Sequence, residues 1–215
     1  MSAAAVHAWA ESRWRELWHR LGCTVPPADA LAALLDAYAE DHRAYHDFAH
    51  VRACLRELDG VSASAAHPEE IEMGLWFHDA IYDPRRDDNE ERSAQWAARA
   101  LRECGVGEAV VARIGSMIRA TRHHASARTA DEALLLDIDL AILGGDEARF
   151  RRYDADIRKE YAWVPERDYR AARERVLRGF LERDPIYRTD VMRTRYEANA
   201  RRNIAAALVH PENLR

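Results

Sequence analysis

Glycine and proline are both scarce in this sequence, with 9 and 7 residues among 215. So few of them leave little room for the many turns that a β-sandwich or β-barrel needs. Alanine, leucine, arginine and glutamate dominate instead, and these residue types favour helices. The composition therefore predicts an all-α protein, and the length suits one sizeable domain or at most two small ones.

Cysteine is also sparse, and Cys23, Cys54 and Cys104 lie far apart without any C-x-x-C motif. An odd number of widely spaced cysteines is typical of reduced thiols in a cytoplasmic protein. Residues 1–14 contain no apolar stretch of the kind found in signal peptides, and no apolar run approaches the length that crosses a bilayer. We therefore expect a cytoplasmic protein without a membrane partner.

The sequence has no excess of positive charge, because the net charge is −5 at pH 7 and arginine is interleaved with aspartate and glutamate. Such interleaving is typical of solvated helix faces. Proteins that bind nucleic acids instead cluster their positive charge. We therefore expect no nucleic acid as the main partner. With 48% hydrophobic and 32% charged residues, the chain is globular rather than disordered.

Apolar residues recur at helical spacing along almost the whole chain, and Pro165 and Pro185 mark breaks in the pattern. We find no internal repeat, low-complexity segment or flexible linker, so we expect a single domain of residues 1–215. The predicted helices cover residues 7–20, 28–40, 48–58, 68–79, 89–104, 108–120, 134–143, 146–162, 166–182 and 189–209.

The most informative stretch is residues 76–83, in which apolar residues bracket the pair His78-Asp79. An ionisable pair in apolar surroundings is costly unless something compensates it. A divalent metal would do so, because imidazole and carboxylate both suit Mn, Fe or Zn. A buried histidine that hydrogen-bonds its neighbours is the alternative. Other residues that could share a metal site are His46, His50, His123, His124, Asp137 and Asp139.

Asp137 and Asp139 lie on different sides of their predicted helix. At about 100° per residue, Asp139 shares its side with Leu136 and Leu143, which form the bulkier apolar stripe. A carboxylate on that stripe needs a charged partner more urgently. We therefore favour Asp139 as a metal ligand, with Asp137 as a helix cap or an outer hydrogen-bonding partner.

These residues follow the order H…H-D…D of the HD-domain superfamily, and the sequence resembles the branch described as predicted metal-dependent HD phosphohydrolases. The resemblance covers nearly the whole chain from residue 43 on. It implies an all-α, HD-type helical bundle that hydrolyses a phosphate ester or anhydride. The metal-site region would span about 43–145, with the helices of 146–209 packed on it. The segments that carry the resemblance are 43–50, 76–83, 88–94, 137–144 and 196–203.

Carried over residue by residue, the resemblance gives a divalent ion four protein ligands. The ion would be Mn, Mg, Fe, Zn, Co or Ni, and the substrate a small phosphorylated metabolite such as a nucleotide. The implied ligands are His50, His78, Asp79 and Asp139.

Asp83 corresponds to the second carboxylate of the H-D-x-x-E-D segment found in alarmone hydrolases, where Tyr82 of this chain replaces the glutamate. This departure counts against guanosine tetraphosphate as the substrate, because a proposed acid or base is missing. Glu90 in the neighbouring loop could replace it. Asp83 and Glu90 are therefore the predicted catalytic residues, which would take a proton from water or orient it.

Three cationic side chains are predicted to bind the substrate, because guanidinium and imidazolium groups suit phosphate oxygens. They are Arg43, His46 and His123. An ordinary salt bridge for Arg43 and a structural hydrogen bond for His46, His123 or His124 remain open alternatives. The pair His123-His124 resembles the additional histidines of two-metal HD enzymes.

A polar set at helical spacing near the end of the chain is expected to form a network that fixes the last helix to the bundle. Its members are Tyr196, Glu197, Arg201 and Asn203. A tryptophan stripe near the beginning is expected in the core or at the contact of a homodimer. It consists of Trp9, Trp14 and Trp18.

The sequence therefore predicts a metal-dependent phosphohydrolase, with two alternatives. The first alternative is a di-iron oxygenase on the same fold, which needs two ions and more histidine ligands. The pair His123-His124 leaves it open. The second alternative is a protein that binds a metal or ligand without catalysis, in which the site only stabilises the fold or reports binding.

Overall fold

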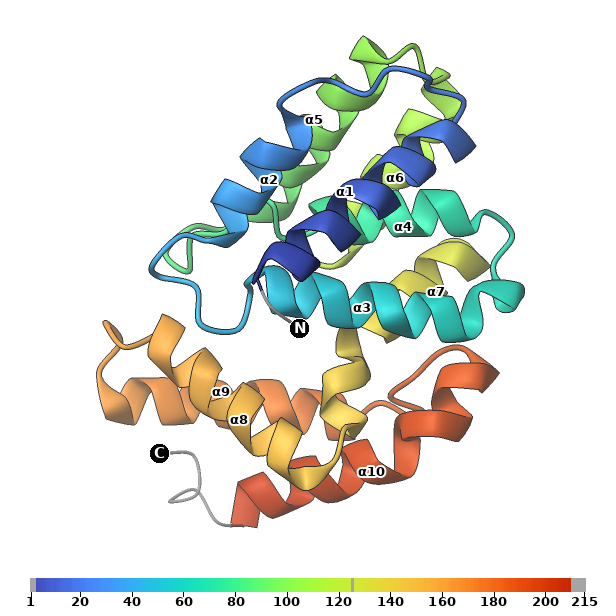
Figure 1. Ribbon diagram of the computed structural model, residues 1–215. Helices are drawn as coiled ribbons and strands as arrows, with labels where there is room; N and C mark the ends of the chain where they lie inside the picture. Colours follow the sequence, from blue (N-terminus) through green and yellow to red (C-terminus); the bar gives the residue numbers. More distant parts are fainter. Residues whose placement is uncertain (1–2, 125, 210–215) are drawn as a thin grey trace.

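The computed structural model describes residues 3–124 and 126–209, and these residues form helices without any strand (Figure 1). The predicted all-α class is confirmed. The α-helices are α1 (Ala3–Arg20), α2 (Ala30–Tyr38), α3 (Phe48–Val61), α4 (Pro68–Phe77), α5 (Asn89–Glu103), α6 (Glu108–Ala120), α7 (Ala130–Asp139), α8 (Glu147–Glu160), α9 (Glu166–Leu181) and α10 (Asp190–Val209). Two 3-10 helices, η1 (Ser62–Ser64) and η2 (Leu140–Gly144), follow α3 and α7.

Most helices begin where the sequence analysis expects them, because local residues set their ends. Asp47 caps α3 by accepting hydrogen bonds from the backbone N–H groups of Ala49 and His50. The helix predicted at 134–143 differs most. It begins at Ala130, because the hydroxyl of Thr129 accepts the N–H of Glu132 at 3.1 Å, and it changes to a 3-10 helix after Asp139.

Helix α4 lies at the centre of the bundle and packs against α1, α3, α5, α6 and α7. All its residues from Glu70 to Phe77 are buried, as expected for a helix surrounded on every side. The two acidic residues among them form ion pairs, Glu70 with Arg113 and Glu72 with Arg13. This packing fixes the C-terminal end of α4, which leads directly into His78 and Asp79.

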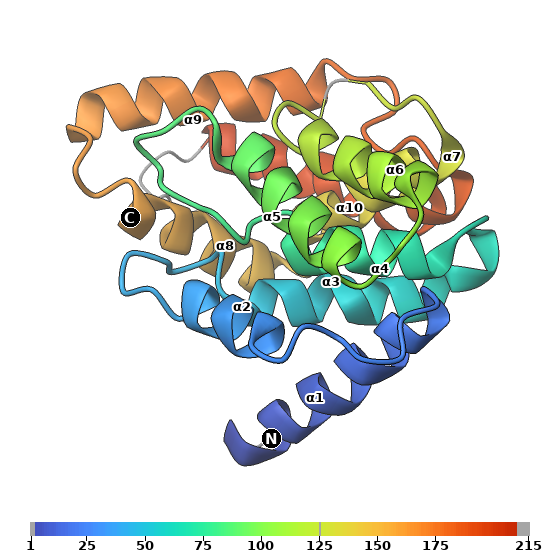
Figure 2. The ribbon, with the colours of Figure 1, turned by 90° about the horizontal axis from the view of Figure 1, so that it is seen from above.

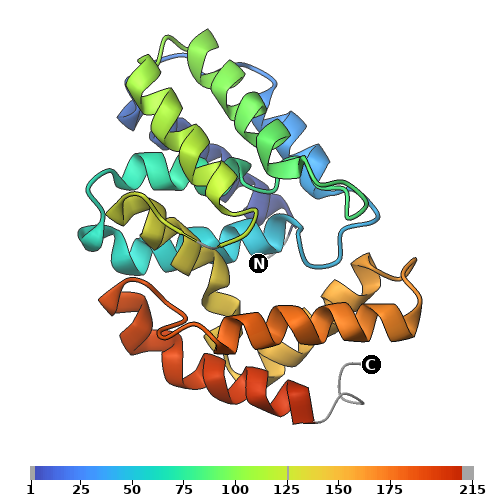
Figure 3. The ribbon, with the colours of Figure 1, turned by 180° about the vertical axis from the view of Figure 1, so that it is seen from behind.

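The helices α1 to α7 form one group, and α8 to α10 form a second group below it, with η2 running between them (Figures 1 and 3). Seen from above, α1 and α9 lie on opposite sides of the molecule (Figure 2). One hydrophobic core extends from Ala10 in α1 to Ala207 in α10. Trp14 and Trp18 belong to this core, and Trp9 packs against it.

Helix α10 is held by the polar network that the sequence analysis expected. Glu197 accepts the N–H groups of Ile186 and Tyr187, and Arg201 donates to Glu197 at 2.8 Å. The amide of Asn203 donates to the carbonyls of Leu143 and Gly145, while the hydroxyl of Tyr196 donates to Glu57. In the described chain no helix, α10 included, is both long and apolar enough to span a membrane.

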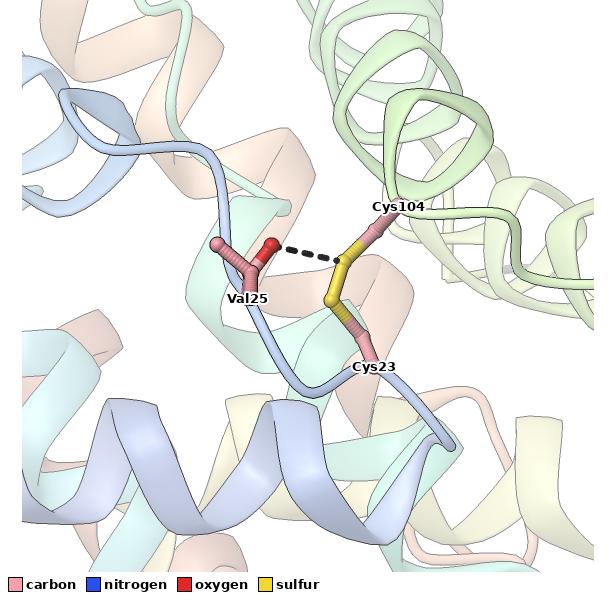
Figure 4. The surroundings of a disulfide bond; sticks show 3 residues. All are labelled: Cys23, Val25 and Cys104. Carbon is pink, nitrogen blue, oxygen red and sulfur yellow. Dashed lines mark hydrogen bonds between the residues drawn. A yellow bond between two sulfur atoms is a disulfide. The ribbon is translucent and has the colours of Figure 1, made fainter.

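Cys23 and Cys104 form a disulfide between the α1–α2 connection and the end of α5 (Figure 4). Their Cα atoms lie 5.7 Å apart, within the usual range for a disulfide. The expectation that all three cysteines are reduced thiols is therefore wrong for this pair, while Cys54 is free and buried. Because 81 residues separate the two half-cystines, their spacing gave no sign of the bond. The cysteines therefore no longer support the expectation of a reducing compartment.

Candidate metal centre

Two histidines and two aspartates converge where α3, α4 and α7 meet. His50 lies in the first turn of α3, His78 and Asp79 follow α4, and Asp139 is the last residue of α7. The Asp47 cap fixes the backbone of the first turn of α3, and so it fixes the position of His50. These are the four residues that the resemblance implied as ligands, and the structure places them in one cluster.

The nitrogen and oxygen atoms of this cluster have the spacing of ligands around one ion. The Nε2 atom of His50 lies 3.1 Å from Nε2 of His78 and 3.0 Å from Oδ1 of Asp139. The Nε2 atom of His78 lies 3.0 Å from Oδ2 of Asp79 and 3.4 Å from Oδ1 of Asp139. Two ligand atoms about 2.1 Å from one ion are about 3.0 Å apart at a right angle and about 3.4 Å apart at a tetrahedral angle. His50, His78 and Asp139 therefore fit one divalent metal, and Asp79 lies beside them at His78.

The ring of His78 is oriented for metal binding by a hydrogen bond on its outer side. Its Nδ1–H donates to the carbonyl oxygen of Leu75 at 2.9 Å. With the proton on Nδ1, the lone pair of Nε2 is directed at the cluster, as is usual for histidines that bind metals. The ring of His50 has the thiol of Cys54 beside it, with Sγ 3.8 Å from Nδ1, and burial raises the pKa of that thiol well above its ordinary value.

Charge accumulates at this cluster. Burial favours the protonated form of Asp79, but His78 and His46 outweigh burial and lower the pKa of that carboxyl below its ordinary value. Burial also opposes ionisation of Asp139, yet His78, His124 and His50 hold its pKa well below the ordinary value. Both carboxylates are therefore ionised at neutral pH, which is the form that binds a cation.

Asp137 lies outside the cluster. It is fully buried, and its carboxylate accepts the N–H groups of Arg188 and Thr189 at 3.0 and 2.7 Å. The hydroxyl of Thr189 donates to it as well. Asp137 thus holds the segment that leads into α10, while Asp139 turns toward His50 and His78.

His124 joins the cluster from the end of α6. Its Nε2 atom lies 2.8 Å from Oδ2 of Asp139, so the two oxygens of that carboxylate face different histidines. The backbone of His124 has φ 47°, a left-handed conformation that is uncommon outside glycine. The sequence analysis assigned substrate binding to His123, but the structure exposes His123 and brings His124 to the site. No spacing rule distinguishes two adjacent histidines when the turn between them is irregular.

Glu160, at the end of α8, is a residue that the sequence analysis missed. One of its carboxylate oxygens accepts the N–H groups of Ala44, Tyr45 and His46 at 2.9, 2.7 and 2.9 Å. The other accepts the hydroxyl of Tyr82 at 2.7 Å and lies 2.6 Å from Nδ1 of His46. Despite burial, the contacts with His46 lower the pKa of Glu160 to about 2. Glu160 therefore shapes the loop before α3 and orients His46.

The sequence does contain one signal for Glu160. Phe150, Asp154, Ile157 and Glu160 share the buried side of α8, so an acid follows an apolar stripe and requires a partner. That partner, His46, is 114 residues away, so the sequence alone could not identify it.

Arg43 is buried beneath the site rather than beside a cavity. Its guanidinium donates to the carbonyl oxygens of Asp79 and Ala80 at 2.7 and 3.2 Å. It also donates to the carbonyl of His46 and to the side chain of Glu40. Its side chain is 0% exposed, so in this structure Arg43 fixes the backbone that carries Asp79 and does not reach a substrate.

Asp83 and Glu90, the predicted catalytic residues, lie in the loop after the cluster and at the beginning of α5. The carboxylate of Asp83 accepts the N–H of Arg85 at 2.9 Å, and its backbone exchanges two hydrogen bonds with the side chain of Asn89. Asp83 therefore closes the 83–89 loop. Within the described residues, neither Asp83 nor Glu90 has a hydrogen bond or ion pair with the four clustered side chains.

A cavity of about 360 Å³, which we call the polar cavity, opens on one side of the cluster. His50 and Asp139 line it, as do Arg149 and Arg152. Both arginines are exposed, and no carboxylate in the part of the chain that the structure describes pairs with either guanidinium. These two unpaired cations could bind an anionic group close to the cluster.

Carboxylates also line the polar cavity, but they are already engaged. Asp47 caps α3, Glu57 accepts the hydroxyl of Tyr196, and Asp156 binds Lys159. None of them forms an ion pair with Arg149 or Arg152 among the described residues, although their negative charge stays in the cavity.

A second cavity of about 400 Å³ lies between the cluster and the helices α8 and α9, and we call it the aromatic cavity. His46, His124 and Asp139 line it at the cluster. The rings of Tyr45 and Tyr153 line both cavities and meet edge to face with their centroids 4.6 Å apart. The cluster therefore faces a polar space and an apolar one.

No protein-family model, curated protein or solved structure matches this chain.

Proposed function

We propose that the protein is a metal-dependent phosphohydrolase of the HD type, acting on a small phosphorylated metabolite. The observation that supports this most is the group of His50, His78 and Asp139 at ligand spacing, with Asp79 beside His78 and two unpaired arginines in the adjoining cavity. Nitrogen and oxygen donors of this kind suit Mn, Fe, Co, Ni or Zn, and an open side suits catalysis better than a closed structural site.

A divalent ion held by this cluster would make bound water a better nucleophile and neutralise charge on the phosphoryl group. His50, His78, Asp79 and Asp139 would hold that ion. Arg149 and Arg152 would bind the remaining phosphoryl oxygens, a task predicted for Arg43 from the sequence.

His46 is a third cationic side chain in the proposal. Burial opposes its protonation, but Asp79 and Glu160 outweigh burial and raise the pKa of His46 above its ordinary value. It would therefore present a positive charge to the aromatic cavity. Asp83 and Glu90 receive no role, because the contacts that support one are absent among the described residues.

The proposal is tested by phosphate release from a panel of phosphate esters and anhydrides, with each divalent ion in turn and after chelation. Release should require an ion and should be lost in Asp79→Ala. A folded, metal-loaded protein that releases no phosphate from any member of the panel would count against it.

The amount of bound metal in single variants distinguishes residues that bind the ion from residues that only lie near it. His50→Ala removes one of four donors, so bound metal measured by mass spectrometry should fall steeply, while excess ion partly restores it. His46→Ala should keep its metal and change the Michaelis constant. Full metal content in His50→Ala, with loss in His46→Ala, means that the ligand is assigned to the wrong histidine.

One contact favours a second candidate function, a di-iron oxygenase. Because His124 approaches Oδ2 of Asp139, that carboxylate could bridge two ions. Two redox-active irons for each chain, together with oxygen consumption, would support the oxygenase. One ion for each chain, or two redox-inert ions, would exclude the oxygenase and keep the phosphohydrolase as the proposal.

A further inference from the structure

The polar cavity offers hydrogen-bond acceptors that the protein itself uses only in part. Asp47, Glu57 and Asp156 line it and are half-buried, and each uses one carboxylate oxygen for an internal contact. In the part of the chain that the structure describes, the other oxygen of each has no hydrogen-bond or ion-pair partner. None of these three oxygens is sealed from solvent, so each remains accessible for a hydrogen bond.

The donors of the polar cavity lie on the same helix face as one of these acids. Arg149, Arg152 and Asp156 follow one another in α8 at spacings of three and four residues, so their side chains share one face of the helix. A guanidinium only donates hydrogen bonds, and an ionised carboxylate only accepts them. The cavity therefore presents both kinds of group along one wall.

The balance of charge decides which chemical group suits this lining. A phosphate monoester carries a charge of about −1.5 to −2 at neutral pH, which the two guanidiniums match. A second anionic group would meet the three carboxylates, and the described lining residues include no further arginine to offset it. An apolar group would remove water from the carboxylates without replacing its hydrogen bonds. A hydroxyl group is neutral and both donates and accepts, so several hydroxyls suit the lining best.

The cavity also has room for such a group. Its volume of about 360 Å³ falls in the range of small-molecule sites. His50 and Asp139 of the cluster line the same cavity, so one phosphate ester can place its phosphoryl group at the cluster and its organic half in the cavity. The space exists because much of the wall consists of small side chains, which are Ala44, Ala49, Ala53 and Ala141.

We propose that the organic half of the substrate is a neutral, polyhydroxylated chain or ring, whose hydroxyl groups bind Glu57 and Asp156 in the polar cavity. The proposal rests on the phosphohydrolase function, and it adds the substrate class, a sugar or polyol phosphate, and two specificity residues. The phosphoryl group lies at the cluster. Water adds to phosphorus, the P–O bond to the organic half breaks, and the released oxygen takes the proton that the water loses.

Binding of phosphonates tests the subsite without any turnover, because the reaction does not break their C–P bond. The probes are 3,4-dihydroxybutylphosphonate, in which a methylene replaces the ester oxygen of glycerol 3-phosphate, and butylphosphonate, which lacks the hydroxyls. Both carry the same charge, so the ratio of their affinities reports the hydroxyls alone. Isothermal titration calorimetry on the Mn²⁺-loaded wild type should show tighter binding of the dihydroxy probe, by about fivefold or more for one to two hydrogen bonds. Equal affinities, or no binding of either probe, overturn the proposal.

Isosteric variants assign the preference to the two acids. In Glu57→Gln and Asp156→Asn the amide oxygen keeps the contact with Tyr196 or Lys159, so a donor amide replaces the free acceptor oxygen. Each variant should lower the ratio of the two affinities. A ratio that stays at the wild-type value in both variants overturns the proposal.

Glu147→Gln is the matched control for the loss of one negative charge. Glu147 is an exposed acid on α8 that pairs with Arg151, and this variant should keep the wild-type ratio. Asp47 is left unchanged, because its cap fixes the first turn of α3 and with it His50.

Phosphate release distinguishes failure of this inference from failure of the proposed function. If glycerol 3-phosphate and propyl phosphate are hydrolysed with equal kcat/KM, and Glu57→Gln leaves both values unchanged, the hydroxyl subsite is wrong and the phosphohydrolase stands. If no ester is hydrolysed while the dihydroxy probe still binds more tightly than butylphosphonate, the subsite stands and the phosphohydrolase is wrong.

Discussion

A single carboxylate, Asp139, connects most of the features of the candidate site. Its Oδ1 atom faces His50 and His78, its Oδ2 atom faces His124, and both cavities touch it. An isosteric change to asparagine keeps the shape and removes the charge. Asp139→Asn should therefore weaken the contacts of His50, His78 and His124 with this side chain while leaving its size unchanged.

The two adjacent histidines 123 and 124 should respond differently to substitution. His124→Ala should weaken metal binding by roughly 10- to 100-fold, the usual effect of losing a group that orients a ligand. His123→Ala, at an exposed position, is the matched control and should leave metal binding unchanged. Titration of the metal-free protein with Mn²⁺ measures both. The opposite pattern would assign this support of metal binding to His123, for which the sequence predicted substrate binding.

The contact between Glu160 and His46 should make stability depend on pH. The pKa of Glu160 is lowered from 4.5 to about 2, so its contribution is present above pH 4.5 and is lost as the pH falls toward 2. The pKa of His46 is raised from 6.5, so its contribution is present below pH 6.5 and is lost as the pH rises through the raised value. The pair should therefore stabilise the fold most between these limits.

Urea unfolding of the metal-free protein at several pH values measures this effect. Glu160→Gln should lower the free energy of unfolding most at pH 5 to 6, and the difference from the wild type should shrink toward pH 2. Glu147→Gln, which alters an exposed acid at the other end of α8, is the control. A difference that does not change with pH would assign the loss to the hydrogen bonds with the 44–46 backbone rather than to charge.

Among the helices, α10 and η2 approach so closely that only glycine fits between them. A Cβ atom added at Gly144 would lie 2.6 Å from the backbone oxygen of Tyr196 and 2.9 Å from its Cα atom. A backbone cannot move aside as a side chain can, so the two helices would have to separate. The network around Glu197 and Asn203 resists that separation.

Gly144→Ala should therefore destabilise the fold by about 1–3 kcal/mol, the usual cost of overpacking. Gly179→Ala is the matched control, because nothing lies within 4 Å of a Cβ added there in α9. It should stabilise the fold by roughly 0.5–1 kcal/mol, since alanine is the better helix former. Thermal unfolding of both variants checks the pair. Equal stabilities would mean that η2 and α10 can move apart at little cost.

The helices were predictable from the sequence because their signals are local. Asp47, Pro68 and Pro165 mark helix beginnings within a few residues of the chain, and apolar spacing marks the buried sides. Asp139 was separated from Asp137 by the same rule. By contrast, the partners Glu160 and His46 are joined only by the fold, so their contact has no local signal.

Irregular backbone was the second reason why parts of the site could not be predicted from the sequence. The left-handed turn at His124 follows α6, and no periodic rule predicts which way its side chain points. The sequence indicated Arg43 as a phosphate contact, whereas the cavity indicates Arg149 and Arg152. Arg43 is conspicuous because it begins a motif, whereas Arg149 and Arg152 stand in an arginine-rich helix and are distinguished only by the cavity that they line.

At the scale of the molecule, the Cys23–Cys104 bond closes a long loop that contains the helices from α2 to α5. Its sequence separation is 81 residues, for which chain entropy predicts a stabilisation of about 4 kcal/mol. Reduction, or Cys23→Ser, should lower the free energy of unfolding by up to that amount. Cys54→Ser is the control, and its stability should not change on adding reductant. No change in the wild type on reduction would mean that the packing of the α1–α2 connection, and not the bond, holds this region.

The aromatic cavity lies where the two groups of helices meet, because Asp139 and His46 line one side of it and residues of α8 and α9 line the other. The clustered side chains come from α3, α4 and α7, whereas Tyr153, Tyr169 and Arg173 come from α8 and α9. The short helix η2, which begins directly after Asp139, joins the two groups. A tilt of one group against the other would change the shape of the aromatic cavity without altering the four clustered side chains. Substitutions of Tyr169 or Arg173 would therefore reshape this cavity while the four clustered side chains keep the helices that carry them.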